Sequence, residues 1–521
     1  MPDETSLPAR PPLAALAVTA LAAGFLIAHL AAVSLGAYEF HRDELLYLAM
    51  GRHLRLWRMD FPPGIAILAQ TLRHTVGDSL VAVHALSALA ASLVVVLAAL
   101  IARELGGGWR AQALAALAIV GNPLFMRAGA LYQPVVLDQV AWTLGYLALA
   151  RWRRTDDPRW WLGVGVAAGL GLLCKFSILF FGFGVFVAVL LLPERRVLLT
   201  RWPWLAALVS LGIGAPSLVG QLALDWPVVG QMHDLQSTQL EHTTALGFVG
   251  GQLLMGPGVL LAVAGAWAAF AWRPLARWRV VVLAGVVSFL TLLLLHGKSY
   301  YAGPVFPAMM AAGAVWLDAR VGGARGWRTR AALGGITLLI VAYAVLVLPL
   351  GFPFLQPEPM ARYAARLGIS AAVTTNTGHH LALPQDYADM LGWEAQARTM
   401  AGAYNALSPA DRARVVIAAG NYGEAGALDY YGPRLGLPTP VSTGGSFWFF
   451  GPGERRGDVV LVASGDDDTK ADLETEWAHC ASAATVDNPW GVDEERHVTI
   501  WRCDAPRRSL QALWLSRAGR H

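Results

Sequence analysis

The sequence predicts an α-helical polytopic membrane domain followed by a C-terminal extracytoplasmic α/β domain. Three observations support this: 55% of the 521 residues are hydrophobic, only 15% are charged, and long apolar runs repeat through the first two thirds of the chain. Soluble globular domains carry about 25% charged residues. From about Pro357 the apolar runs give way to the shorter pattern of a soluble domain. We therefore divide the chain into residues 1–352 and 353–521.

The membrane domain contains about eleven apolar runs that could each cross a bilayer as a helix. They lie near residues 13–36, 79–101, 111–126, 135–150, 161–174, 176–192, 203–222, 247–271, 280–296, 303–318 and 331–350. Several runs are shorter than the roughly twenty residues that span a bilayer comfortably, so one of them could be re-entrant.

The distribution of Lys and Arg predicts how these helices are oriented. If the N-terminus is cytoplasmic, the Arg-rich loops all lie inside, as the positive-inside rule requires. These loops are 102–110, 151–160, 193–202, 272–279 and 319–330. An odd number of crossings then places the C-terminal domain outside. We expect a multi-pass protein of the inner (cytoplasmic) membrane with a periplasmic or extracellular C-terminal domain.

The first outside loop breaks this charge rule, and it is longer than a simple connection needs to be. Its segment Tyr38–Gly64 contains, in order, Asp43, Glu44, Tyr47, Arg52, Arg55, Arg58 and Phe61-Pro62-Pro63. The stretch from Arg52 to Arg58 suits a helix lying along the lipid headgroups. The acid pair alone suits either catalysis or the acidic first turn of a helix.

Other ionisable residues within or beside apolar runs are few, and such residues are costly in a membrane and often functional. The candidates are Asp138 after Tyr132-Gln133-Pro134, Lys175 in the run GLLCKFS, and His296, Lys298, Tyr300 and Tyr301 in one short loop. Under the predicted orientation they lie at or near the outer membrane face. A lysine there could bind a lipid phosphate, or it could simply extend from a helix end toward the headgroups.

The last 170 or so residues alternate predicted strands and helices, which favours an α/β layered domain. The predicted strands are 371–375, 414–419, 458–463 and 498–502, and the predicted helices are 387–407 and 468–479. The glycine-rich segment Gly420–Gly426 suits either a phosphate-cradling turn or a tight strand-to-helix turn. Cys480 and Cys503 could pair in an oxidising compartment, but the sequence does not decide this.

Together these features resemble the C-type polytopic glycosyltransferases, which include the dolichyl-phosphate-mannose protein mannosyltransferases and the bacterial aminoarabinose transferases of lipid A. The resemblance covers about residues 10–350. It rests on Asp43-Glu44 with Tyr47, Pro62-Pro63, Asp138, Lys175, and Lys298-Ser299-Tyr300-Tyr301 followed by Pro304 and Pro307. The segment Met59-Asp60-Phe61 departs from the pattern, because no Lys-Pro-Pro element is present, and the C-terminal domain matches neither branch closely.

The resemblance implies a transmembrane glycosyltransferase domain with the C-type fold, and transfer of a sugar from a polyprenyl-phosphate donor to an extracytoplasmic lipid, glycan or protein acceptor, with inversion. Asp43 would be the general base, with Glu44 as an adjacent helper. Lys175 and Lys298 would face the departing phosphate. The remaining residues expected to bind substrate are Tyr47, Arg58, Asp138, His296, Tyr300 and Tyr301.

The sequence identifies no certain cofactor and leaves a divalent cation possible. Glu44, His41 or His296 could recruit a divalent cation, but their spacing does not support a metal site. Membrane lipids are expected partners, and the small net charge gives no reason to expect nucleic acid.

Two alternative functions use membrane proteins of comparable size. A lipid-linked-sugar flippase or solute transporter would place its ionisable residues near the membrane midplane and show internal repeats, whereas the candidates here lie toward the outer edge. A glycan polymerase or ligase of similar architecture is compatible with the sequence, because only the length of the acceptor would differ.

Overall fold

The computed structural model describes residues 10–240, 243–323, 327–368, 380–465 and 469–517. The chain folds into two compact units. The helical unit comprises Met1–Leu35, Val83–Leu218 and Leu235–Phe352. The mixed unit comprises Gly36–Ala82, Val219–Asp234 and Pro353–His521, so the first outside loop folds together with the C-terminal segment. The assignment of 1–352 and 353–521 to a glycosyltransferase domain and a periplasmic domain stays a prediction.

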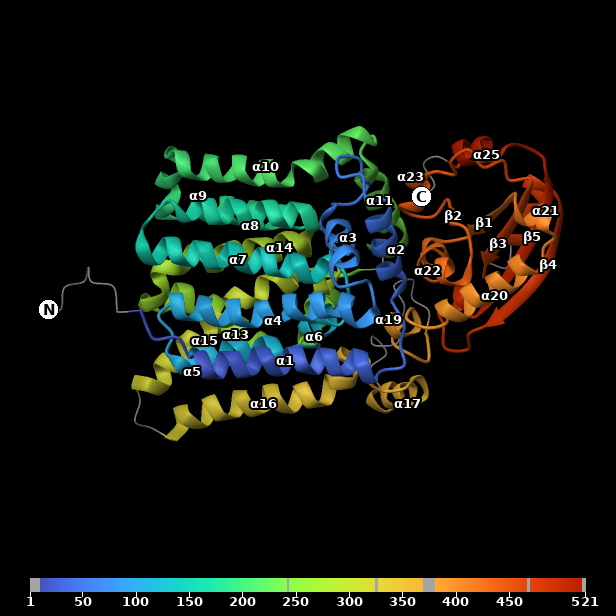
Figure 1. Cartoon of the computed structure of the whole chain (residues 1–521). Helices are drawn as coiled ribbons and strands as arrows, with labels where there is room; N and C mark the ends of the chain where they lie inside the picture. The colour runs from blue at the N-terminus through green and yellow to red at the C-terminus, as the bar shows by residue number, and fades with distance from the viewer. Residues whose placement is uncertain (1–9, 241–242, 324–326, 369–379, 466–468, 518–521) are drawn as a thin grey trace. The chain divides into compact units, whose positions relative to one another are not determined.

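The predicted apolar runs all fall on helices (Figure 1). These helices are α1 (Ala15–Leu35), α4 (Leu80–Glu104), α5 (Trp109–Val120), α6 (Pro123–Gly129), α7 (Pro134–Thr155), α8 (Trp160–Cys174), α9 (Ile178–Leu191), α10 (Arg201–Ala223), α12 (Ala245–Leu253), α13 (Gly258–Ala271), α14 (Arg279–Leu294), α15 (Phe306–Gly323) and α16 (Trp327–Gly351). Short helices η1 (Pro193–Leu199), η3 (Arg273–Trp278) and η4 (Ser299–Val305) lie between some of them.

Within the described residues, five helices are long and apolar enough to cross a membrane, or up to eight if each bent pair counts as one span. The bent pairs are α5 with α6 (66°), α9 with η1 (112°) and α12 with α13 (111°). A proline follows each break, and proline cannot donate a helical backbone hydrogen bond. The predicted polytopic helical fold is confirmed, and the number of about eleven crossings stays a prediction.

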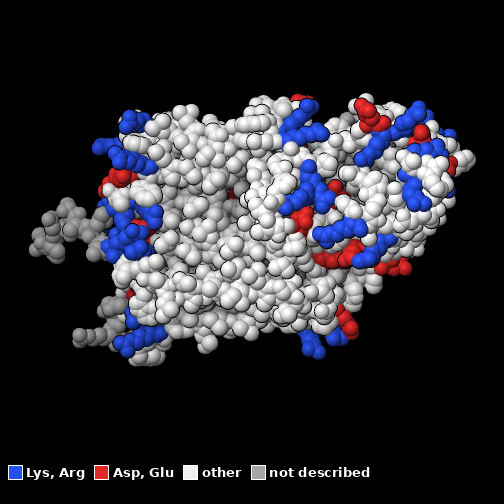
Figure 2. All heavy atoms as spheres, viewed as in Figure 1, with Lys and Arg blue, Asp and Glu red and all other residues white. Residues whose placement is uncertain are grey.

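The loops predicted to be cytoplasmic meet at one end of the helical unit. Arg153 Nη2 lies 2.9 Å from Glu194 Oε1, and Arg277 pairs with Asp156. Figure 2 shows Lys and Arg gathered at this end and a broad, almost uncharged surface along the helices. The arrangement groups these loops together, and their cytoplasmic orientation stays a prediction.

The mixed unit contains a five-stranded sheet in the order β2-β1-β3-β5-β4. The strands are β1 (Val415–Ala419), β2 (Val441–Ser442), β3 (Val459–Ser464), β4 (Trp477–Asp487) and β5 (His497–Pro506). β1 pairs in parallel with β2 and β3, whereas β5 is antiparallel to both β3 and β4. The predicted α/β character is confirmed, with β1, β3 and β5 at the predicted strands.

Two predicted elements differ from the structure. The helix predicted over 387–407 is divided into α19 (Gln385–Ala388) and α20 (Trp393–Asn405). The helix predicted over 468–479 ends at Glu476 as α24 (Thr469–Glu476), and β4 begins at the next residue. β4 is an edge strand rich in alanine and largely exposed, so it lacks the buried β-branched residues that signal a strand. The strand predicted over 371–375 lies outside the described residues.

The remaining helices of the mixed unit come from all three of its segments. They are α2 (Arg42–Arg52), α3 (Gly64–Thr75), α11 (Pro227–Leu235), α17 (Pro357–Leu367), α21 (Pro409–Arg412), α22 (Tyr422–Tyr431), η5 (Gly432–Leu435), α23 (Phe447–Phe450), η6 (Asp493–Glu495) and α25 (Leu510–Ser516). A π-helix over Gln236–Leu240 follows α11 and belongs to the helical unit.

Helix α2 shares a hydrophobic core with the sheet. Leu46 and Met50 of α2 pack in one buried cluster with Leu428 of α22 and Ile417 of β1. A Cβ atom at Gly426 of α22 would lie 2.8 Å from the Cβ of Leu45, so only glycine permits this close approach of α2 and α22. The first outside loop is therefore built into the core of the C-terminal fold.

Cys480 and Cys503 form a disulfide between directly opposed positions of β4 and β5. The structure thus answers the question that the sequence left open. The third cysteine, Cys174, is free and lies at the end of α8.

We predict that replacing Cys480 and Cys503 by serine destabilises the mixed unit. For the sequence separation of 23 residues, loop-closure entropy gives a loss of about 3 kcal/mol. Thermal unfolding of the purified protein, followed by circular dichroism, measures the effect. Dithiothreitol should lower the melting temperature of the wild-type protein and leave the double variant unchanged. A wild-type protein insensitive to dithiothreitol would contradict the prediction.

Candidate functional site

The start of α2 places the acid pair. His41 is the N-cap, and its Nδ1 accepts a hydrogen bond from the Asp43 amide at 3.1 Å. In return, the Glu44 carboxylate accepts from the His41 amide at 2.7 Å, which completes a capping box. The Glu44 side chain is fully buried. Glu44 therefore fixes the first turn of α2 and the direction in which Asp43 points.

Asp43 is the more accessible of the two acids. About a third of its side chain (31%) is exposed. The Tyr422 hydroxyl, from the first residue of α22, donates a hydrogen bond to Asp43 Oδ1 at 3.0 Å. Burial and the nearby Asp43 carboxylate raise the pKa of Tyr422 well above its ordinary value, so the hydroxyl remains a donor.

Arg42 connects α2 to α22 and to the loop before β5. Its guanidinium lies over the Tyr422 ring at 5.5 Å and pairs with Asp389 at 3.3 Å and Glu495 at 3.0 Å. Glu495 also accepts a hydrogen bond from Asn421 Nδ2 at 2.8 Å. These contacts hold the Arg42 guanidinium over the Tyr422 ring, whose hydroxyl contacts Asp43.

The segment Gly420–Gly426 is a strand-to-helix turn whose amides are already bound within the chain. Asn421 Oδ1 accepts from the amides of Gly423 and Glu424, and Glu424 Oε2 accepts from those of Gly420 and Asn421. The Glu424 carboxylate occupies the place that a phosphate would take. The tight-turn interpretation is therefore favoured over the phosphate cradle.

Tyr47 and Arg58, both predicted to bind substrate, lie on the first loop. Tyr47 follows Asp43 by four positions on α2, which puts both on one helix face. Burial raises the pKa of Tyr47, with further contributions from Asp43 and Glu44. Arg58 lies in a turn, where its amide donates to the Arg55 carbonyl at 2.7 Å.

The prediction of a helix through Arg52–Arg58 is wrong, because α2 ends at Arg52. The chain then turns, and the amide of Arg55 donates to the sulfur of the buried Met59 at 3.4 Å. Leu56 and Trp57 are exposed at this turn. The mixture of arginine with exposed Leu and Trp still suits a membrane interface.

Asp60 is buried beside the proline pair that precedes α3. Its Oδ2 accepts a hydrogen bond from Ser446 Oγ at 2.7 Å, which connects the first loop to the segment before α23. Burial raises the pKa of Asp60 to about 6, and the Ser446 hydrogen bond opposes this in part.

The helical unit contains a second polar cluster. Asp138 near the start of α7 accepts hydrogen bonds from Ser177 Oγ at 2.7 Å and Trp142 Nε1 at 3.1 Å. Lys175 lies at the break between α8 and α9 and interacts electrostatically with Asp138. Its ammonium lies 4.9 Å from the centre of the Tyr301 ring, a cation–π distance. Three predicted site residues therefore meet here: Asp138, Lys175 and Tyr301.

The other predicted residues of this unit lie on the loop between α14 and α15. Tyr300 packs edge-to-face on Tyr301 at 4.7 Å, which continues the aromatic cluster. Lys298 is the extended residue before η4 and is half-buried. His296 is exposed and adopts a left-handed backbone conformation with φ 54°, and its carbonyl accepts from Thr243.

Sequence analysis did not identify several residues of the mixed unit that lie around the first turn of α2. Tyr422 lies in the glycine-rich turn that the sequence did single out, but its partner Asp43 is 379 positions away. Nothing in the sequence points to Asp389 or Glu495. Among the described residues, no group of three or more His, Cys, Asp or Glu side chains is arranged to hold a metal ion.

We predict that Asp60→Asn changes how stability depends on pH. The folded pKa of about 6 exceeds the ordinary 3.8, so the folded state holds the proton more tightly. The stabilisation is complete below about pH 4 and is lost as pH rises through 6, by roughly 3 kcal/mol. Asparagine is neutral throughout, so the variant should gain stability over the wild type between about pH 4 and pH 6 and keep that advantage up to pH 8.

Melting temperatures of both proteins across this pH range measure the effect. Burial raises the pKa of Glu495 to about 7. This residue is present in both proteins, so its contribution to the pH dependence cancels in the comparison. A difference between the two proteins that does not change with pH would contradict the assignment.

Residues 60–219 match the family model described as dolichyl-phosphate-mannose-protein mannosyltransferase. No curated protein sequence matches the chain significantly.

The fold is similar to that of ArnT from Cupriavidus metallidurans. The apo-state crystal structure gives a TM-score of 0.59 at 16% identity, covering 94% of this chain and 98% of ArnT. The structure bound to undecaprenyl phosphate gives 0.58 at 16% identity, with 93% and 97% covered. The oligosaccharyltransferase AglB from Archaeoglobus fulgidus, at a TM-score of 0.46, 13% identity and coverage of 81% and 60%, is too distant to support an argument.

The chain is therefore a polytopic membrane protein with the C-type glycosyltransferase fold, and the resemblance inferred from its sequence is confirmed.

Proposed function

We propose that the protein is an integral membrane glycosyltransferase that moves a sugar from a polyprenyl-phosphate donor to an extracytoplasmic lipid, glycan or protein acceptor. The observation that carries the proposal is the geometry of Asp43. Its carboxylate is partly exposed at the start of a capped helix, and Tyr422 holds one of its oxygens. A general base needs this combination of access and fixed orientation.

The reaction is a displacement at the anomeric carbon of the donor sugar. The acceptor oxygen or nitrogen attacks this carbon, and its proton passes to the Asp43 carboxylate. The bond between the anomeric carbon and the phosphate oxygen breaks, and the electron pair leaves with the lipid phosphate. A single displacement inverts the anomeric configuration.

Glu44 assists without touching the substrate. Its buried carboxylate closes the capping box at the His41 amide, so it sets the orientation of Asp43. An ionised carboxylate at this end of α2 also complements the helix dipole.

The departing phosphate requires positive charge, which we assign to Lys175 and Lys298. Lys175 is held beside Asp138 and the Tyr301 ring, so its ammonium has a defined position. The similarity in fold to ArnT, which binds undecaprenyl phosphate, supports a polyprenyl phosphate as the carrier lipid.

The remaining predicted residues would contact the sugar or its carrier. Tyr47 shares the helix face of Asp43, and Arg58 lies in the exposed turn with Trp57, which suits contact with a lipid phosphate. Tyr300 and His296 would extend the site around Tyr301.

We assign the protein to the inner (cytoplasmic) membrane, with a cytoplasmic N-terminus and a periplasmic or extracellular C-terminal segment. The clustering of the predicted inside loops at one end of the helical unit supports this orientation.

We predict that Asp43→Asn lowers transfer from a polyprenyl-phosphate sugar at least 100-fold. The variant has no carboxylate at this position to take the proton of the attacking group. Transfer of a labelled sugar in membranes measures the rate. Asp386→Asn is the matched control, since Asp386 is an exposed acid 3.8 Å from His41 to which we assign no catalytic role. It should retain transfer.

Both variants should insert in the membrane and melt as the wild type does. Wild-type transfer by Asp43→Asn, or equal loss in the Asp386→Asn control, would refute the assignment of Asp43 as the base.

We predict that a reporter enzyme fused after residue 400 is active only if it works outside the cytoplasm. The Arg-rich loops favour this orientation. Paired fusions of alkaline phosphatase and green fluorescent protein at this position and in the loop 151–160 measure the sidedness. The two positions should give opposite signals, and a cytoplasmic residue 400 would overturn both the orientation and the assigned site.

A further inference from the structure

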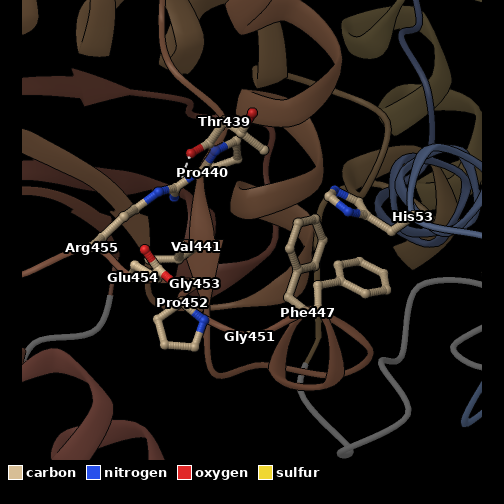
Figure 3. Close-up of a pocket in the computed structure, with 11 residues that line it drawn as sticks. His53, Thr439, Pro440, Val441, Phe447, Gly451, Pro452, Gly453, Glu454 and Arg455 are labelled. Carbon is tan, nitrogen blue, oxygen red and sulfur yellow. Dashed lines mark hydrogen bonds between the residues drawn. The ribbon is translucent and has the colours of Figure 1, made fainter.

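A cavity of about 210 Å³ lies within the mixed unit, between the end of α2 and the loop after α23 (Figure 3). His53, the residue that ends α2, lines one side. Glu454 and Arg455 line the opposite side, and Phe447 lies between the two sides. Phe450 also lines the cavity. The volume is below the 300–1,000 Å³ of pockets for drug-sized ligands, so it suits a single ring or a group of that size.

One wall of the cavity is aromatic. The His53 imidazole stacks on the Phe450 ring, with centroids 4.4 Å apart and planes 17° from parallel. Phe450 in turn contacts the buried Phe447 edge-to-face at 5.2 Å. Rings fixed against each other in this way give a rigid apolar surface, which can pack against the C–H groups of a sugar ring.

The opposite wall is polar and carries charges of both signs. Arg455 donates from Nη1 to the Thr439 carbonyl at 2.9 Å, which fixes the guanidinium at the rim. Glu454 is its exposed neighbour. The guanidinium group donates hydrogen bonds and the carboxylate accepts them. A sugar hydroxyl group can donate and accept, so adjacent hydroxyl groups of one sugar could bind both side chains.

The loop that carries these charges is held in place. Gln511 Nε2 of α25 donates to the carbonyls of Gly453 at 3.0 Å and Arg455 at 2.9 Å. Gly451 and Gly453 have φ values of 80° and 64°, which favour glycine over other residues. The loop conformation is therefore set by its sequence and its packing before any ligand binds.

The cavity and the proposed base belong to opposite ends of one helix. Asp43 and His53 are ten positions apart along α2, which corresponds to about 15 Å at 1.5 Å per residue. An acceptor of a few sugar units could reach from one to the other. A binding group at this distance would position the acceptor without taking part in the chemistry.

We propose that this cavity is a carbohydrate subsite that binds a neutral pyranose ring of the acceptor. The proposal rests on the proposed glycosyltransferase function for its role, although binding itself can be measured without transfer. The aromatic wall packs against the C–H face of the ring, and Glu454 and Arg455 form hydrogen bonds with its hydroxyl groups. The presence of Glu454 disfavours an anionic headgroup or phosphate.

The test measures binding of mannotriose, maltotriose and chitotriose to the full-length protein in nanodiscs by saturation-transfer NMR. At least one of the three should bind, and Glu454→Gln and Arg455→Ala should each weaken its affinity about tenfold. Glu454 is exposed, so Glu454→Gln tests the site even if Arg455→Ala disturbs the loop. Arg456→Ala is the matched control, because Arg456 is exposed and does not line the cavity.

Asp43→Asn should bind the trisaccharide as the wild type does, which separates this proposal from the proposed function. Absence of binding by all three sugars, or affinity unchanged in both cavity variants, overturns the subsite even if Asp43→Asn abolishes transfer. Inorganic phosphate that competes with the trisaccharide at millimolar concentration would overturn the neutral-sugar assignment.

Discussion

The close packing of α2 against α22 is the contact on which the proposed site depends. Glycine at position 426 lets the backbone of α22 approach Leu45. Because of this approach, Tyr422 at the start of α22 reaches Asp43 at the start of α2. A larger side chain at position 426 would separate the helices and with them the donor and the carboxylate. The C-terminal segment is thus part of the environment of the proposed base.

The two neighbouring acids have different tasks because the helix treats their positions differently. Glu44 is the N3 residue, whose side chain can reach back to the N-cap amide, and there it is buried. Asp43, one position earlier, points elsewhere and stays partly exposed. The sequence alone suggested either an acidic first turn or a catalytic pair. The structure shows Glu44 in the first-turn role, and the catalytic role of Asp43 stays a proposal.

Much of the fold was predictable because it follows from patterns that are local in sequence. Apolar runs predicted the helices, and the strand at Val415–Ala419 was visible as a buried hydrophobic run. The site was predictable only in part. Lys175 and Asp138 stood out because charge within an apolar run is rare. The hydrogen-bonding partners of Asp138 did not, since a serine and a tryptophan are ordinary there. Tyr422 and Glu495 reach the first loop only through tertiary folding, which periodicity does not report.

The cavity lies in the mixed unit and the Lys175 cluster lies in the helical unit, so acceptor and donor specificity could vary separately. Helix α2 carries the proposed base at its first turn and one wall of the cavity at its end. The cavity's other walls come from the segment 439–455, which contributes no residue of the Lys175 cluster. Changes in that segment could therefore alter which acceptor binds while the groups assigned to the donor phosphate stay the same. Such a separation lets one fold keep its donor chemistry and exchange its acceptors by loop variation.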